Sequence, residues 1–227
     1  MEELGTFSIV ARDRKAREFG GGTTTAIPCV GAYLPFVQEG VGAIATQAWV
    51  NVNLGHQGLA LMRDGVGVKA ALEALLSEDT GRERRQVAGI DDKSVFGFTG
   101  SECTDSKGHI LGGDFVVAGN MLANNEVLKR MADTFKRSKG ELGARLIASL
   151  EAGQLAGGDS RGKQSSVLLV ASPSPKLYHD IRVDLSKEPI QELRRIYDRC
   201  FELQEEYGEG DDERGEVLRL KVARVQK

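Results

Sequence analysis

The glycine-rich segment at residues 157–165, GGDSRGKQS, carries the residue types of two catalytic motifs. Its G-x-x-x-x-G-K spacing approaches a phosphate-binding loop, but Gln164 stands where that loop has a Ser or Thr for magnesium. The same segment reads G-x-S-x-G around Ser160, as in the nucleophile elbow of α/β-hydrolases. Both motifs need a strand before the loop and a helix after it, whereas this loop follows a predicted helix and precedes a predicted strand. Nucleotide binding through Lys163 and a serine nucleophile are therefore both disfavoured.

Two charged residues of this loop have a second interpretation. Asp159 and Arg161 lie two residues apart, which suits either a structural ion pair or a clamp for a polar substrate group, and the sequence leaves both open. His179 could complete a Ser-Asp-His order along the chain. We expect it at the surface instead, because it is isolated beside the polar segment SPSPKLY.

Thr6 raises a different kind of chemistry. In GTFSIVARD the residues Phe7, Ile9 and Ala11 alternate with Thr6, Ser8, Val10 and Arg12 at the two-residue period of a pleated sheet, which predicts a strand with one face in the core. A hydroxyl near the start of a chain could also be a nucleophile if the preceding MEELG were removed. This segment by itself favours the interpretation of Thr6 as a strand residue, and a role as nucleophile has to be argued from other parts of the sequence.

Three polar residues stand at the edge of or inside apolar strands. Asn120 ends DFVVAGN and could cap the next element or direct its amide toward an oxyanion. Thr46 and Gln47 interrupt GAIATQAW, where buried polar side chains need hydrogen-bond partners. Such positions are suggestive of a buried polar site without identifying one.

The elements that must position these residues come in pairs. The sequence predicts strands at residues 6–13, 20–30, 41–49, 114–120 and 165–170, a hairpin from 85 to 100 around Asp92 and Lys93, and helices at 67–79, 125–139, 141–155 and 189–201. Paired strands followed by paired helices differ from the strict alternation of a parallel βαβ sheet. The pattern favours antiparallel sheets with helices stacked outside them. The many glycines within the strands indicate close approach of the backbone to another layer or to a substrate.

Composition excludes several classes of protein. The 227 residues are 41% hydrophobic and 28% charged with a net charge of -3, so no basic surface for nucleic acid is expected. No apolar run approaches the roughly 20 residues that a bilayer requires, and the first residues do not resemble a signal peptide, so we expect a cytoplasmic protein. The three cysteines and three histidines show no metal-binding spacing, so neither a disulfide framework nor a metal site is expected.

Five blocks of the chain together resemble a known family. They are TFSIVARD, GVGAIATQAW with LGHQGLALMRDG, RQVAGID, GHILGGDFVVAGNML and GGDSRGKQSSVLLV, and they cover Thr6 to about Val170 in the same order and with similar spacing. The family is the domain of unknown function 1028, an uncharacterised group placed with the N-terminal nucleophile (Ntn) hydrolases. The segment from Pro189 to Phe201 is similar to one that often closes the family's core.

The resemblance implies a fold and a mechanism class. The fold is α/β (α+β), a four-layer αββα sandwich of two antiparallel sheets of the Ntn-hydrolase type. In these enzymes a Thr, Ser or Cys at the first position of the mature chain attacks a carbonyl, and its own α-amine acts as the base, directly or through water. The residue must be terminal because an α-amine with a pKa near 8 can accept a proton, whereas an amide nitrogen cannot.

The resemblance also assigns roles to individual residues. Thr6 would be the nucleophile, Asn120 and Asp159 would join it as catalytic residues, and the substrate-binding positions would be Thr25, Thr46, Gln47, Arg161 and Gln164. The sequence departs from the family at its start, because MEELG precedes Thr6 where the family usually has Met followed by Thr. The Gly5-Thr6 bond would therefore have to be cut, as Ntn precursors cut themselves.

These observations give two competing functions. The first is an amidohydrolase for a small-molecule C–N amide bond, without metal or organic cofactor, active once residues 1–5 are removed as a propeptide. The second is a non-catalytic binding or assembly protein that keeps the fold without processing. Either would have a domain at residues 6–206 and a charged tail at 207–227, would associate with copies of itself, and would bind neither nucleic acid nor membrane.

Overall fold

The first strand, β1 (Thr6–Asp13), is buried on both faces and therefore lies between two layers. Phe7 and Ile9 pack into an apolar core with helices, whereas Val10 packs into a second core with another sheet. Thr6 and Ser8 share the face of Val10, because side chains alternate along a strand. The nucleophile candidate thus faces the space between two sheets.

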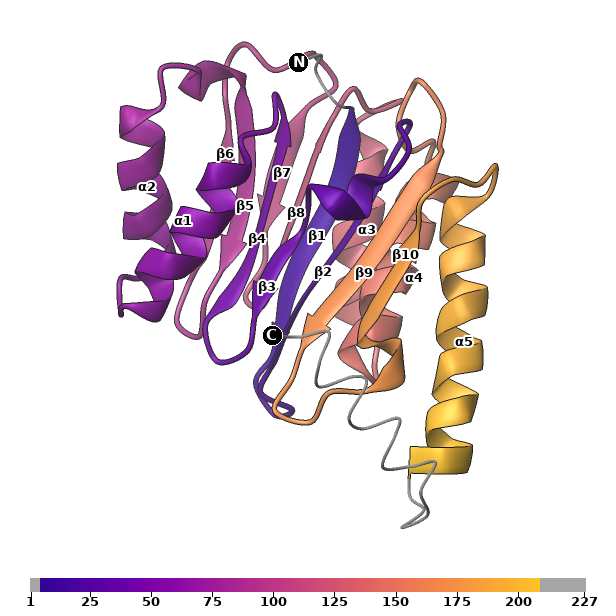
Figure 1. Cartoon of the computed structure of the whole chain (residues 1–227). Coiled ribbons are helices and arrows are strands. Elements are labelled where there is room, and N and C mark those ends of the chain that lie inside the picture. Colours follow the sequence, from indigo (N-terminus) through magenta and orange to yellow (C-terminus); the bar gives the residue numbers. More distant parts are fainter. Residues whose placement is uncertain (1–4, 209–227) are drawn as a thin grey trace.

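The computed structural model describes residues 5–208 and shows two antiparallel sheets stacked between layers of helices (Figure 1). The larger sheet has the order β10-β9-β2-β1-β8-β7. Its strands besides β1 are β2 (Glu18–Thr25), β7 (Gly108–Leu111), β8 (Phe115–Asn120), β9 (Ser165–Ala171) and β10 (Asp180–Val183). The smaller sheet runs β3 (Phe36–Gln38), β4 (Gly42–Ala48), β5 (Arg85–Ile90) and β6 (Val95–Thr99).

Helices cover the outer face of each sheet. The smaller sheet is covered by α1 (Val52–Arg63) and α2 (Val68–Glu78), and the larger one by α3 (Glu126–Arg137), α4 (Leu142–Leu155) and α5 (Pro189–Gly208) (Figure 1). Short 3-10 helices lie at Val30–Ala32, Arg82–Arg84 and Leu177–His179. No helix within the described range 5–208 has the length and apolar character needed to cross a membrane. The four layers confirm the expected αββα sandwich.

Most predicted elements are found, with differences at their ends. The hairpin around Asp92 and Lys93 is confirmed as β5 and β6, and α3 and α4 lie where expected. The strand expected at residues 20–30 begins at Glu18 and ends at Thr25, after which the chain turns. Helix α5 runs beyond residue 201 and takes up the first two residues of the expected tail, and residues 1–4 and 209–227 lie outside the described part.

The glycines of β2 allow close approach to both neighbouring layers. A Cβ on Gly20 would lie 2.8 Å from Leu146 of α4, whereas one on Gly21 would lie 2.7 Å from Pro35 on the opposite side. Contacts this short would displace backbone or core side chains. The glycines therefore serve layer packing, one of the two reasons expected from the sequence.

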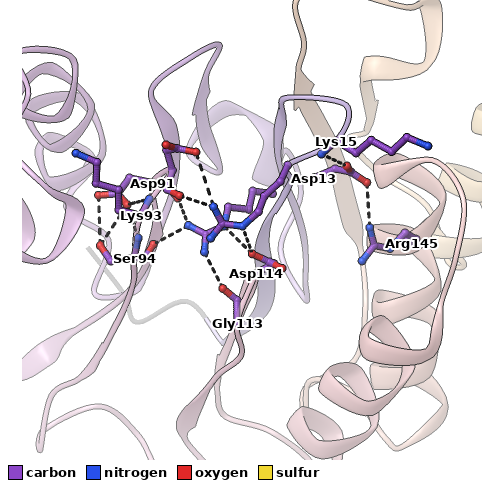
Figure 2. Close-up of polar contacts among 11 residues, drawn as sticks. Asp13, Lys15, Asp91, Lys93, Ser94, Gly113, Asp114 and Arg145 are labelled. Carbon is purple, nitrogen blue, oxygen red and sulfur yellow. Dashed lines mark hydrogen bonds and ion pairs between the residues drawn. The ribbon is translucent and has the colours of Figure 1, made fainter.

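The buried guanidinium of Arg12 connects the two sheets at the end of the sandwich far from Thr6. Its Nε donates to Asp114 Oδ1 at 2.8 Å and its Nη2 to the Gly113 carbonyl at 2.8 Å, next to β8 (Figure 2). Its Nη1 donates to the Asp91 carbonyl, next to β5 of the other sheet. Since a buried charge must be fully hydrogen-bonded to be tolerated, this cluster fixes the two sheets relative to each other.

Candidate functional site

Thr6 begins β1 between two polar residues of the neighbouring strands. It pairs in register with Thr25 of β2 and with Asn120 of β8, so the three side chains lie on the same face of the sheet. All three are at most 1% exposed. The Thr6 hydroxyl donates to Thr25 Oγ1 at 3.4 Å. The structure thus brings together residues of three strands, of which Thr6 and Asn120 are more than a hundred positions apart in the sequence.

The carbonyl oxygen of Gly5, the residue before Thr6, is held by two donors. Thr25 Oγ1 donates to it at 2.5 Å and Arg161 Nη2 at 2.8 Å. A hydroxyl and a guanidinium on one carbonyl oxygen withdraw electron density from its carbon, and they stabilise negative charge on the oxygen. The peptide bond in question is Gly5-Thr6, whose nitrogen belongs to the nucleophile candidate.

Asp159 fixes the guanidinium of Arg161. Arg161 Nε donates to Asp159 Oδ1 at 3.1 Å and its Nη2 to Oδ2 at 2.8 Å, a two-point contact with defined geometry. The Asp159 side chain is 1% exposed, and it also accepts from the backbone nitrogens of Arg161 at 2.9 Å and Ala26 at 3.3 Å. Asp159 and Arg161 therefore form the structural ion pair that was one of the two alternatives left open by the sequence. The same guanidinium also contacts the Gly5 carbonyl.

The loop that carries this pair is attached to the strands around Thr6. Gly158 has a φ of +63°, a left-handed conformation that glycine adopts at low cost, and this turns the chain after α4. Asp159 then forms a β-bridge with Leu122, two residues after Asn120. The loop leaves a helix and enters β9, as expected from the sequence, which is the reverse of a phosphate-binding loop or a serine elbow.

Gln47 supports Thr6 from the smaller sheet. Its Nε2 donates to the Thr6 carbonyl at 3.2 Å and to Gln86 Oε1 at 2.7 Å, while its Oε1 accepts from Ser8 Oγ at 2.6 Å. Ser8 in turn accepts from Thr23 Oγ1 at 2.9 Å. This polar chain crosses the space between the sheets, where every member is at most 1% exposed. It fixes the backbone at Thr6 relative to both sheets.

Sequence reasoning missed Ser8, Thr23 and Gln86 as members of this chain. Gln86 gave the same signal as Gln47, a long polar side chain within an apolar strand, here RQVAGI. Ser8 and Thr23 gave little signal, because small hydroxyl side chains are common in strands.

Three candidates lie away from the Gly5 carbonyl. Thr46 points to the opposite face of β4 from Gln47, the face covered by α1 and α2, and its Oγ1 has no hydrogen-bond partner among the described residues. Gln164 donates from Nε2 to the Ala26 carbonyl at 2.6 Å and from its backbone to the Thr25 carbonyl at 2.8 Å, so it fixes the end of β2. Lys163 forms an ion pair with Glu188.

One group among residues 5–208 has the donor types and spacing to hold a metal ion. Glu18, Glu141 and His179 have ligand atoms within 4.8 Å of one another. However, His179 Nδ1 accepts from the Lys176 backbone nitrogen at 3.3 Å, so the neutral ring carries its proton on Nε2, the nitrogen that faces Glu18. Lys176 Nζ also lies 3.3 Å from Glu141. The Nε2 proton of His179 and the ammonium group of Lys176 thus occupy the positions from which this cluster would contact a metal ion.

The expected surface position of His179 is wrong, because the residue is 1% exposed. Burial, with a smaller contribution from the charge of Lys176, lowers its pKa from 6.5 to about 4. The native state therefore disfavours the imidazolium, whereas the unfolded chain binds the proton below pH 6.5. The stability contributed by neutral His179 is present above that pH and is lost as pH falls toward 4.

A His179→Gln variant tests this pH dependence. We expect the difference in unfolding free energy between the wild type and the variant to shrink as pH falls from 7 to 4, measured by denaturant titration at each pH. The charged neighbours Glu18, Glu141 and Lys176 are present in both proteins. Burial raises the pKa of Glu18, so the contribution of this carboxyl to stability increases as pH falls, opposite to that of His179. A difference in unfolding free energy that stays constant from pH 7 to pH 4 would contradict the lowered pKa of His179.

Comparison with known proteins matches this chain to one family. The model of a family of unknown function, DUF1028, matches residues 6–193. A crystal structure of a DUF1028 protein from Silicibacter pomeroyi is similar to the chain with a TM-score of 0.81 and 31% identity, covering 95% of this chain and 94% of that one. Anbu (ancestral beta-subunit) from Yersinia bercovieri aligns at a TM-score of 0.40 and 10% identity, over 91% and 99% of the two chains. No curated protein matches. The chain belongs to the family of unknown function DUF1028.

Proposed function

We propose that this chain is an N-terminal-nucleophile amidohydrolase that removes its own residues 1–5 and then cleaves a C–N amide bond in a small molecule. The observation that carries the proposal is the Gly5 carbonyl oxygen, which accepts hydrogen bonds from Thr25 and from Arg161. A peptide carbonyl held by a hydroxyl and a fixed guanidinium, directly before a threonine, is arranged for attack at its carbon.

Processing proceeds as an acyl shift. Thr6 Oγ1 bonds to the Gly5 carbonyl carbon, and the oxygen of the five-membered intermediate takes up negative charge beside Thr25 and Arg161. The C–N bond then breaks, the proton of the hydroxyl passes to the nitrogen, and Gly5 becomes an ester of Thr6. Water hydrolyses the ester, which releases residues 1–5 with a carboxylate at Gly5 and restores the hydroxyl. The product is a chain that begins with the free amine of Thr6.

Turnover uses the same groups with the new amine as the base. An α-amine with a pKa of about 8 accepts the proton of the Thr6 hydroxyl as the hydroxyl attacks the substrate carbonyl. Thr25 and Arg161, which donate to the Gly5 carbonyl in the unprocessed chain, would donate to the oxyanion, and we assign a third donor role to Asn120, which pairs with Thr6 in register on β8. Each such donor contributes about 3 to 4 kcal/mol to the transition state in well-studied enzymes. Gln47 holds the Thr6 backbone during the reaction.

Intact-mass spectrometry of the purified protein tests the proposal. We expect a population whose mass corresponds to loss of residues 1–5 and whose first residue is Thr6, and we expect this population to hydrolyse small-molecule amides. A chain that stays at full length and is inert on an amide library would contradict the proposal, and would favour a binding protein that keeps the fold without processing.

A further inference from the structure

The α-carbon of Gly5 lies against the guanidinium of Arg161. A Cβ in the L configuration at this position would lie 2.6 Å from Arg161 Nη2 and 2.9 Å from its Cζ and Nε. Each of these separations is shorter than a non-bonded contact allows. Gly5 therefore fits here because one face of its α-carbon carries only hydrogen.

The arginine that causes the clash cannot move without losing its contacts. Its guanidinium makes two hydrogen bonds to Asp159 and one to the Gly5 carbonyl. Asp159 is itself held by the backbone nitrogens of Ala26 and Arg161. A shift of the guanidinium large enough to admit a methyl group would lengthen its hydrogen bonds to Asp159 or to the Gly5 carbonyl, which weakens the pairing of the buried Asp159 carboxylate with its counter-charge.

The position of Gly5 is also the position of an acyl group during turnover. In the processing step the Gly5 carbonyl carbon moves from the nitrogen to the oxygen of the same threonine, and the five-membered ring limits its displacement. The resulting ester has the same bonds as the acyl-enzyme that a substrate would form at Thr6. The acyl group of a substrate and Gly5 therefore occupy one place beside Arg161.

We infer that the enzyme selects acyl groups of the N-acylglycyl type, whose α-carbon carries no side chain, and rejects those with an L side chain on that carbon. This inference rests on the proposed function. For an N-acylglycyl amide, the Thr6 oxygen bonds to the carbonyl carbon, the C–N bond breaks, and the hydroxyl proton reaches the departing amine through the Thr6 α-amine. Water then hydrolyses the ester to the N-acylglycine carboxylate and Thr6.

The first test uses the chain as its own substrate. In cell-free synthesis followed over time by intact mass, Gly5→Ala is expected to lose residues 1–5 at least about tenfold more slowly than the wild type, the scale of one excluded methyl group. Leu4→Ala changes the same extension without adding a Cβ at position 5, so it is the control and should process at the wild-type rate. Circular dichroism shows whether the Gly5→Ala chain is folded.

The second test uses the processed wild-type protein, so it does not depend on the folding of any variant. We expect N-acetylglycine 4-nitroanilide to be hydrolysed with a kcat/KM at least about tenfold above that of the N-acetyl-L-alanine compound. Equal rates for the two anilides, or equal processing of Gly5→Ala and the wild type, would overturn the inference and leave the proposed function intact. Absence of both processing and hydrolysis in the wild type would overturn the proposed function, and the inference with it.

Discussion

Thr6→Ala is expected to stay at full length, with no detectable loss of residues 1–5, because the variant lacks the hydroxyl that attacks the Gly5 carbonyl. Thr6→Ser keeps an oxygen at the same position and is expected to process at a measurable rate. Intact-mass spectrometry and N-terminal sequencing after a fixed time of synthesis distinguish the three chains. The same Thr6→Ala chain should hydrolyse no amide, since it has neither the nucleophile nor a free α-amine beside it.

The change is small enough for the fold to survive. Thr6 loses its hydrogen bond to Thr25 at 3.4 Å, a cost of about 1 kcal/mol, while its backbone contact with Gln47 is kept. Thermal unfolding of the Thr6→Ala and wild-type chains provides the control. A folded Thr6→Ala chain that still loses residues 1–5 would show that another protease cuts the bond, and would contradict self-processing.

Arg161→Ala is expected to slow the removal of residues 1–5 by roughly 100- to 1000-fold, the usual effect of removing one oxyanion donor. The variant removes the charged donor to the Gly5 carbonyl and leaves the Thr25 hydroxyl in place. Arg161→Lys keeps a positive charge but lacks the planar pair of donors that meets Asp159, so its rate should fall between the two. The rate is measured from the time course of the intact mass.

Lys163→Ala is a matched control for this prediction. Lys163 is a cation two residues further along the same loop, but it pairs with Glu188 and makes no hydrogen bond to Gly5. Its loss removes the same charge from the loop and should leave the processing rate unchanged. Equal slowing of both variants would indicate a general effect of loop charge, and an unaffected Arg161→Ala would contradict the role of the guanidinium.

The layers of the fold could be predicted because apolar spacing determines them locally. Leu128, Met131 and Phe135 form one stripe of α3, and Asp92 and Lys93 lie between two strands that pair as expected. The helix α1 was not predicted, because its glycines lower helix propensity. Gly58 is required there by packing, since a Cβ would lie 2.6 Å from Ile44 of β4. Tertiary contact overrides local preference in this helix.

The candidate site could be predicted only in part. Alternation along β4 places Thr46 and Gln47 on opposite faces, but which of them meets Thr6 depends on how the sheets stack, a non-local property. The contact between Arg161 and the Gly5 carbonyl joins residues 156 positions apart through a loop without regular periodicity. The resemblance named the two residues separately, and only the fold shows that they touch.

The covalent bond at Gly5 gives the extension an advantage that no free ligand shares. A group attached beside its reaction partner acts at an effective concentration of about 10⁵ to 10⁸ M. The Gly5 carbonyl can therefore occupy the position beside Thr25 and Arg161 without high affinity. Once the bond is cut, the same five residues become a free peptide, present at one copy for each protein molecule. In the proposed self-processing, dilution alone would then remove this peptide from Thr25 and Arg161, so that each chain would clear its own site by a single irreversible event.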